Sequence, residues 1–146
     1  MSGKKLIVVF GATGHQGGSV VEALQATGEF NIRGVTRNVE KAKEKNPEIE
    51  WVKADQTKPE ELKKAFEGAY GAYVVTNFWD KESMGRETEI GTNLAKIAKE
   101  ANVQQYIWST LPNVEEISGG KISVPHFTDK AKVIIFFYLF HLVFLI

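Results

Sequence analysis

The architecture that this sequence predicts follows from one segment, Gly11-Ala12-Thr13-Gly14-His15-Gln16-Gly17, which comes directly after the short apolar run at residues 6–10. An uninterrupted apolar run of this length indicates a central strand covered on both faces. Residues 20, 21 and 24 then follow a helical pattern that ends at Gly28. A strand, a glycine-rich turn and a helix therefore succeed one another at the start of the chain.

Such a turn suits the pyrophosphate of a dinucleotide. Glycines permit a tight turn and a close approach of bare backbone, and the helix start supplies N–H donors and partial positive charge. The spacing is G-x-x-G-x-x-G, the variant seen in short-chain and extended dehydrogenase-like folds, and not G-x-G-x-x-G. A phosphate loop of the Walker A type is excluded because no Gly-Lys-Ser/Thr follows. The alternative is a purely structural turn.

Strand and helix patterns alternate through most of the chain, which predicts an α/β fold with a parallel sheet. We expect a Rossmann-type doubly wound sheet in the order 3-2-1-4-5, incomplete at the C-terminus. The expected strands lie at residues 6–10, 31–36, 51–52, 72–76 and 105–109, and the expected helices near residues 20–24, 39–45, 57–67 and 87–101. A capping box at Thr57 and Glu60, with Pro59 in the first turn, marks the start of the third helix.

The end of the second strand indicates which dinucleotide is bound. NAD-selective sites place an acidic residue about twenty positions after the glycines to bind the ribose 2′-hydroxyl. This chain has Arg37 there, with Asn38 beside it and Lys41 one helical turn on. A guanidinium suits a 2′-phosphate, so NADP(H) is favoured over NAD(H). An ordinary exposed arginine is the alternative.

Polar residues also follow the third and fourth strands. Asp55 and Gln56 stand where a side chain can reach the adenine, and Thr76, Asn77 and Phe78 face the crevice at the carboxyl ends of the strands. Taken singly, these residues are also common turn formers. Trp51 and Trp108 lie within strands, where core packing is the expected role.

Composition narrows the class of protein. The 146 residues are enough for one domain, and equal numbers of acidic and basic residues argue against direct nucleic-acid binding. Without cysteine there is neither disulfide nor thiolate chemistry, and the three histidines are too scattered to suggest a metal site. No secretory signal is apparent, so the expected location is the cytosol, with the nucleus as an alternative.

Together, the motifs GATGHQGG, VTRN, Asp55-Gln56, VTNFW and HFTDK resemble the NmrA-like family over residues 4–132. The resemblance implies an atypical short-chain dehydrogenase fold that binds NADP(H), regulates partner proteins in response to redox state and does so without turnover. It implies cofactor contacts at Gly11, Ala12, Thr13, Gly14, His15, Gln16, Arg37, Lys41, Asp55, Gln56, Thr76, Asn77, Phe78 and Lys130. It assigns residues 1–132 to an NAD(P)-binding domain.

Catalysis is the point on which the sequence departs from active dehydrogenases of this fold. They carry a Tyr-x-x-x-Lys pair on one face of a helix. Here Lys130 is kept and His126 replaces the tyrosine. No catalytic residue is therefore assigned, although histidine also exchanges protons near neutral pH and an NADPH-dependent reductase stays an alternative. Glu89 falls where related proteins can carry a cofactor-contacting lysine.

Residues 133–146, VIIFFYLFHLVFLI, form an atypical apolar tail where the family pattern predicts a charged amphipathic helix. A membrane anchor is one interpretation, but fourteen helical residues span only about 21 Å of a roughly 30 Å hydrocarbon core. A buried further strand and a non-native end are the others. The abrupt change of composition favours the last, a C-terminally truncated chain with little activity of its own. No membrane contact is expected except through this tail.

Overall fold

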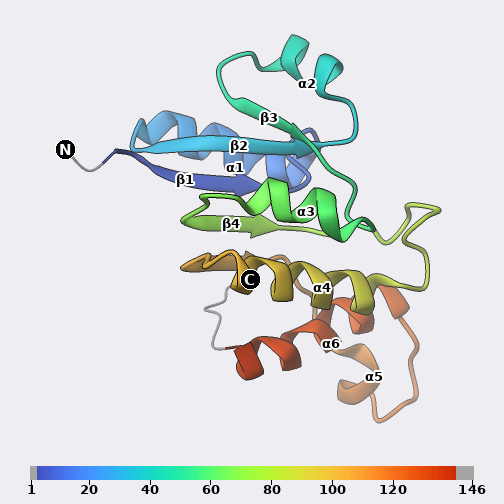
Figure 1. Cartoon of the computed structure of the whole chain (residues 1–146). Coiled ribbons are helices and arrows are strands. Elements are labelled where there is room, and N and C mark those ends of the chain that lie inside the picture. Colours follow the sequence, from blue (N-terminus) through green and yellow to red (C-terminus); the bar gives the residue numbers. More distant parts are fainter. Residues whose placement is uncertain (1–2, 141–146) are drawn as a thin grey trace.

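The computed structural model describes residues 3–140, which form a five-stranded parallel sheet with helices on both faces (Figure 1). The strands are β1 (Lys5–Val9), β2 (Phe30–Thr36), β3 (Glu50–Lys53), β4 (Gly71–Val74) and β5 (Gln105–Trp108). Their order is β3-β2-β1-β4-β5, and every neighbouring pair is parallel. The predicted doubly wound sheet is thus confirmed, and its order changes direction between β1 and β4.

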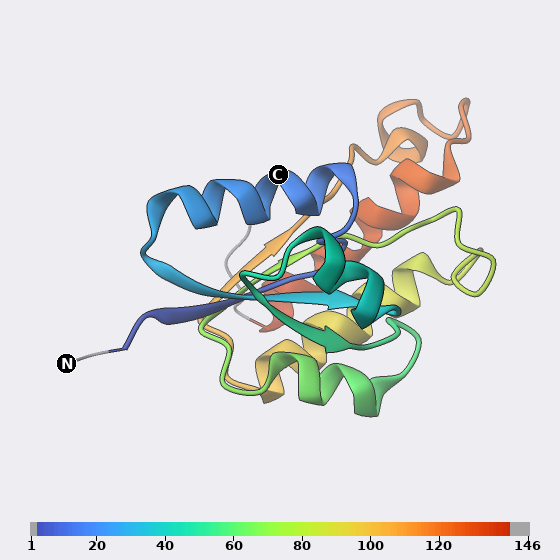
Figure 2. The same cartoon turned by 90° about the horizontal axis from the view of Figure 1, so that it is seen from above.

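Six helices are described: α1 (His15–Thr27), α2 (Val39–Lys45), α3 (Pro59–Phe66), α4 (Glu87–Glu100), α5 (Val114–Ile117) and α6 (Pro125–Phe140). Helix α1 lies on one face of the sheet, and α3 and α4 lie on the other (Figure 2). Helix α6 packs beside α4. The short α5 lies in a stretch where the sequence patterns predicted no element.

The central strand shows why its sequence is apolar without interruption. Neighbouring side chains of a strand point to opposite faces. Val8 belongs to the core under α3 and α4, Val9 belongs to the core under α1, and both are fully buried. Burying one such side chain contributes about 1.5–3 kcal/mol. Trp108 is buried and Trp51 is partly buried against the α1 core, so both tryptophans have the expected packing role.

The start of α3 corrects one prediction. The helix begins at Pro59, but its N-cap is Lys58 and no side-chain capping bond is made. The Thr57 hydroxyl instead donates to Asp55 Oδ1 at 2.6 Å, and Glu61 accepts the Asp55 amide at 2.8 Å. The predicted capping box is therefore wrong, because the Thr57 hydroxyl is bonded to Asp55 in the turn before the helix and does not cap the helix.

The first part of the apolar tail is helical. Residues 133–140 complete α6, so a further strand is the wrong interpretation for them; residues 141–146 lie outside the described residues. Val133 and Phe137 are fully buried, and the Phe137 ring packs on Tyr106 and Trp108. Within residues 3–140, no helix has the length and apolarity that a membrane span requires.

Candidate dinucleotide-binding cleft

A cleft of about 610 Å³ lies at the carboxyl ends of the strands, where the sheet order changes direction. Open α/β sheets bind ligands at this position. The cleft brings together most of the residues that the sequence predicted to contact the cofactor: Gly11, Thr13, Gly14, His15, Gln16, Arg37, Lys41, Asp55, Gln56, Thr76 and Asn77. The other three, Ala12, Phe78 and Lys130, do not line it.

The glycine loop lines the cleft, and its backbone is closely packed. Gly11 has φ +66°, and a Cβ there would lie 2.7 Å from Val75 Cγ1. A Cβ on Gly17 would lie 2.4 Å from the Gly11 carbonyl oxygen. Only glycine fits at these two positions, because the first also needs the left-handed backbone region and the second meets backbone. The loop has therefore the bare backbone that a pyrophosphate requires.

Helix α1 begins at this loop with its amides uncapped. Gly14 is the N-cap, and no side chain makes a capping hydrogen bond. The first-turn amides of an α-helix have no partner within the helix. His15, Gln16 and Gly17, which carry these amides, all line the cleft. Free N–H groups and the positive end of the helix dipole fit an anionic phosphate.

Arg37 stands where β2 ends, at the rim of the cleft. Its side chain is 60% exposed, and Nη2 lies 2.7 Å from Oδ2 of Asp80. Asn38 caps α2 by accepting the Lys41 amide at 3.1 Å, which holds Lys41 one turn from Arg37. Arg37 and Lys41 both line the cleft, so two cationic residues are available to a 2′-phosphate.

Asp55 and Gln56 organise the loop after β3. Burial alone would raise the pKa of the Asp55 carboxyl, but hydrogen bonds from Thr57 and the charges of Arg37 and Lys58 outweigh it and lower the pKa. Asp55 is therefore ionised at neutral pH. The side-chain amide of Gln56 donates from Nε2 to the Val75 carbonyl at 2.9 Å, which joins this loop to the end of β4.

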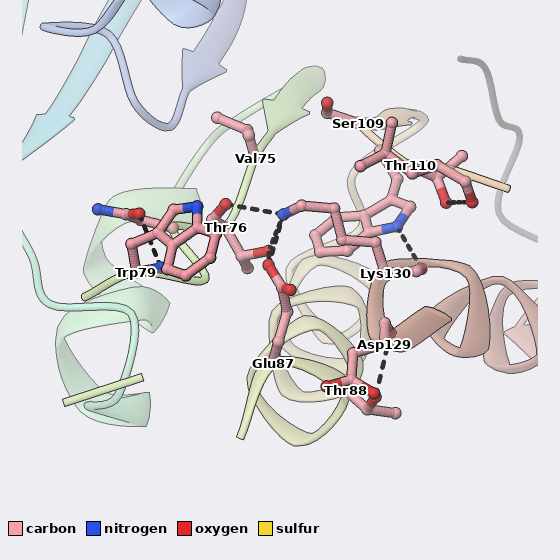
Figure 3. A network of polar contacts seen from close by, with 12 residues as sticks. Val75, Thr76, Trp79, Glu87, Thr88, Ser109, Thr110, Asp129 and Lys130 are labelled. Carbon is pink, nitrogen blue, oxygen red and sulfur yellow. Dashed lines mark hydrogen bonds and ion pairs between the residues drawn. The ribbon is translucent and has the colours of Figure 1, made fainter. Parts of the chain in front are cut away.

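Lys130 lies in a buried polar network with Thr76 and Glu87 (Figure 3). Its ammonium donates to the carbonyl and hydroxyl oxygens of Thr76 at 2.8 and 2.9 Å and forms an ion pair with Glu87. The side chains of Lys130 and Glu87 are only 10% and 0% exposed. Through Thr76, the lysine is thus bonded to the chain just after β4. A direct contact with the cofactor stays a prediction.

His126 is the partly exposed second residue of α6. Its ring packs against Phe78, Trp79 and Phe127, with centroid distances of 5.6, 5.4 and 4.9 Å. Phe78 therefore contributes to an aromatic cluster beside the cleft. Glu89 pairs with Arg86 at the exposed start of α4.

Sequence reasoning missed two acidic residues of this region, Asp80 and Glu87. Both come after the VTNFW motif, in a stretch between β4 and α4 and at the start of α4 to which no motif was assigned. Asp80 lines the cleft and Glu87 neutralises Lys130. The available signal was an acidic residue within a few positions of a strand end that faces the crevice. Ser109, which donates to Gln16 Oε1 at 3.1 Å, was missed in the same way.

Comparisons with known proteins identify related sequences over almost the whole described chain. The pattern of the NmrA-like family matches residues 3–134. An NmrA-like family domain-containing protein of Dictyostelium discoideum is 35% identical over 133 residues, covering 88% of this chain and 43% of the relative. The NmrA-like family domain-containing oxidoreductase himF of Aspergillus japonicus is 35% identical over 136 residues, covering 88% and 41%.

Solved structures of NmrA also match most of this chain. NmrA, described as a negative transcriptional regulator, superposes in its complex with NADP with a TM-score of 0.81 at 26% identity, covering 97% of this chain and 44% of that one. Its complex with NAD gives 0.77 at 27% identity, covering 91% and 41%. This chain therefore spans less than half the length of the relatives it matches.

Proposed function

The chain belongs to the NmrA-like family, and from that premise we propose that it binds NADP(H) in the cleft at the carboxyl ends of its strands. One observation carries the proposal: uncapped amides of α1 and the guanidinium of Arg37 line the same cleft. The first group suits the pyrophosphate and the second suits the 2′-phosphate. Complexes of NmrA with NADP and with NAD support a dinucleotide as the ligand.

We further propose that the bound cofactor serves as a redox signal to a partner protein and is not turned over. Active dehydrogenases of this fold use a tyrosine with a lysine on the same helix face for proton transfer. Here His126 stands in place of the tyrosine and is packed among aromatic rings. Lys130 is held by Glu87 and Thr76. The missing tyrosine and the ion pair made by the lysine support binding without turnover.

A reductase is the second candidate, and the naming of himF as an oxidoreductase favours it. Bound NADPH would supply a hydride to an acceptor. His126 would then be the proton donor, because histidine exchanges protons near neutral pH.

Three measurements on the full chain test cofactor binding and separate the two functions. Titration calorimetry should show binding of NADPH, and its absence would refute the cofactor proposal. NADPH absorbance should then stay constant with carbonyl or quinone acceptors. Steady loss of absorbance that disappears in His126→Ala would favour the reductase. A different affinity for NADPH and NADP⁺ is expected of a redox sensor, and equal affinities would contradict that role.

A further inference from the structure

Asp80 reaches across the mouth of the cleft to the residue that is expected to select the cofactor. It belongs to the segment of residues 77–86 that links β4 to α4, whereas Arg37 follows β2 on the other side of the cleft. Asp80 Oδ2 lies 2.7 Å from Arg37 Nη2. The ion pair therefore connects the two sides of the site.

The two partners are held to different degrees. Asp80 is only 15% exposed, and its other oxygen, Oδ1, accepts the Glu82 amide at 3.1 Å. Its own amide donates to the Asn77 carbonyl at 3.2 Å. Arg37 is 60% exposed and forms no other ion pair within residues 3–140. The turn thus fixes the Asp80 carboxylate, whereas Arg37 is the more exposed partner of the ion pair.

A 2′-phosphate and this carboxylate compete for the same group. Donors of the guanidinium that bind Asp80 are not available to a phosphate, and a carboxylate beside a phosphate repels it. A ribose 2′-hydroxyl is different, since it is uncharged and donates readily to a carboxylate, as in NAD-selective sites. The ion pair therefore disfavours binding of NADP(H) but does not disfavour binding of NAD(H).

We propose that Asp80 is a specificity-determining residue that competes with the 2′-phosphate for Arg37 and so limits the preference of the cleft for NADP(H) over NAD(H). The inference rests on the proposed function and deepens it. Release of Asp80 from Arg37 accompanies binding of the phosphorylated cofactor, and the pair persists beside the unphosphorylated one.

The test uses the full chain and two probes that differ only in the 2′-phosphate, adenosine 2′,5′-bisphosphate and 5′-AMP. They occupy only the adenosine half of the site, so the measurement does not depend on the nicotinamide half. Asp80→Asn keeps an oxygen for the Glu82 amide and removes the charge. By calorimetry, the preference for the bisphosphate, expressed as the ratio of the two Kd values, should rise about three- to tenfold.

Two further variants show whether the effect passes through the ion pair. Glu82→Gln removes the same charge from the same segment, where Glu82 also lines the cleft, and should change the ratio by less than about twofold because no ion pair is lost. In an Arg37→Ala background, Asp80→Asn should have little further effect on the ratio. Circular dichroism checks that each variant is folded.

The remaining outcomes would overturn either the proposed competition or the proposed function. An unchanged ratio in Asp80→Asn overturns the competition, and a lower ratio would show that Asp80 orients Arg37 for the phosphate. An equal gain in Glu82→Gln would assign the effect to overall charge and also overturn the proposal. A wild-type chain that binds neither these probes nor NADPH refutes the proposed function itself, and the inference with it.

Discussion

Arg37 is the single residue on which the expected choice of cofactor depends, because its guanidinium lies at the rim where a 2′-phosphate would bind. Arg37→Ala removes a charge-assisted contact with the phosphate, of order 1.5–3 kcal/mol. We therefore expect NADPH affinity to fall by about ten- to a hundredfold and NADH affinity to change by less than about threefold. Calorimetry with both cofactors measures the two losses.

The chain offers a matched control for that experiment. Arg86 is also an exposed arginine paired with a carboxylate, Glu89, but it does not line the cleft. Arg86→Ala should leave the affinities for both cofactors unchanged. Equal losses of NADPH and NADH in Arg37→Ala would mean that Arg37 does not contact the phosphate.

Gly17 and its neighbour Gly18 give a second test at the scale of one residue. A Cβ on Gly17 would meet the Gly11 carbonyl oxygen at 2.4 Å, a backbone atom that cannot move without opening the loop. Gly17→Ala should cost about 1–3 kcal/mol of unfolding free energy and weaken NADPH binding. Urea unfolding and calorimetry measure these losses.

Gly18→Ala is the control, since its Cβ would lie 3.6 Å from the Ala12 carbonyl oxygen, an ordinary contact. Replacing a helical glycine by alanine without a clash should be neutral or stabilise by about 0.5–1 kcal/mol. If both substitutions had the same effect, close packing of the loop would not explain the glycine at position 17.

Between elements, the buried pair of Glu87 on α4 and Lys130 on α6 joins two helices that pack side by side. Lys130→Met leaves a buried carboxylate without its counter-ion and should cost about 3–5 kcal/mol of unfolding free energy. Glu87→Gln together with Lys130→Met removes both charges and should recover part of that loss. Urea unfolding of the two single variants and the double variant gives the coupling energy.

That coupling also bears on the site. Thr76, which lines the cleft, hydrogen-bonds to both members of the pair. We therefore expect Lys130→Met to lower NADPH affinity, through movement of the end of β4. If the losses of stability in the single variants simply added in the double variant, the pair would not act as a unit.

At the scale of the whole molecule, α6 packs against the core, and its last residues belong to the apolar tail that begins at residue 133. Phe137→Ala removes a fully buried ring from between Tyr106 and Trp108 and should cost about 3–5 kcal/mol. Ile135→Ala, on the same helix but 64% exposed, should change stability by less than about 0.5 kcal/mol. Thermal unfolding compares them, and similar losses would contradict this placement of α6.

The sequence by itself determined the sheet, its strand order and most of the cleft. These features follow from local patterns: an apolar run with glycines behind it, helix periodicity, and the rule that parallel strands bring their carboxyl ends to one edge. Gly11, Arg37, Asp55 and Thr76 could be placed in one cleft because each lies within two residues of the end of a strand. Strand ends are set by short-range signals.

Only the tertiary structure decided which side chains meet across that edge. Arg37 and Asp80 are 43 residues apart, as are Glu87 and Lys130, and no local pattern relates the members of either pair. Likewise, the apolar composition of residues 133–140 does not reveal that Val133 and Phe137 face the core while Ile135 faces outward. Such contacts depend on how loops and helices pack after the sheet has formed. For that reason, the position of the site is a property of the local sequence, whereas the pairing of its charges is a property of the folded chain.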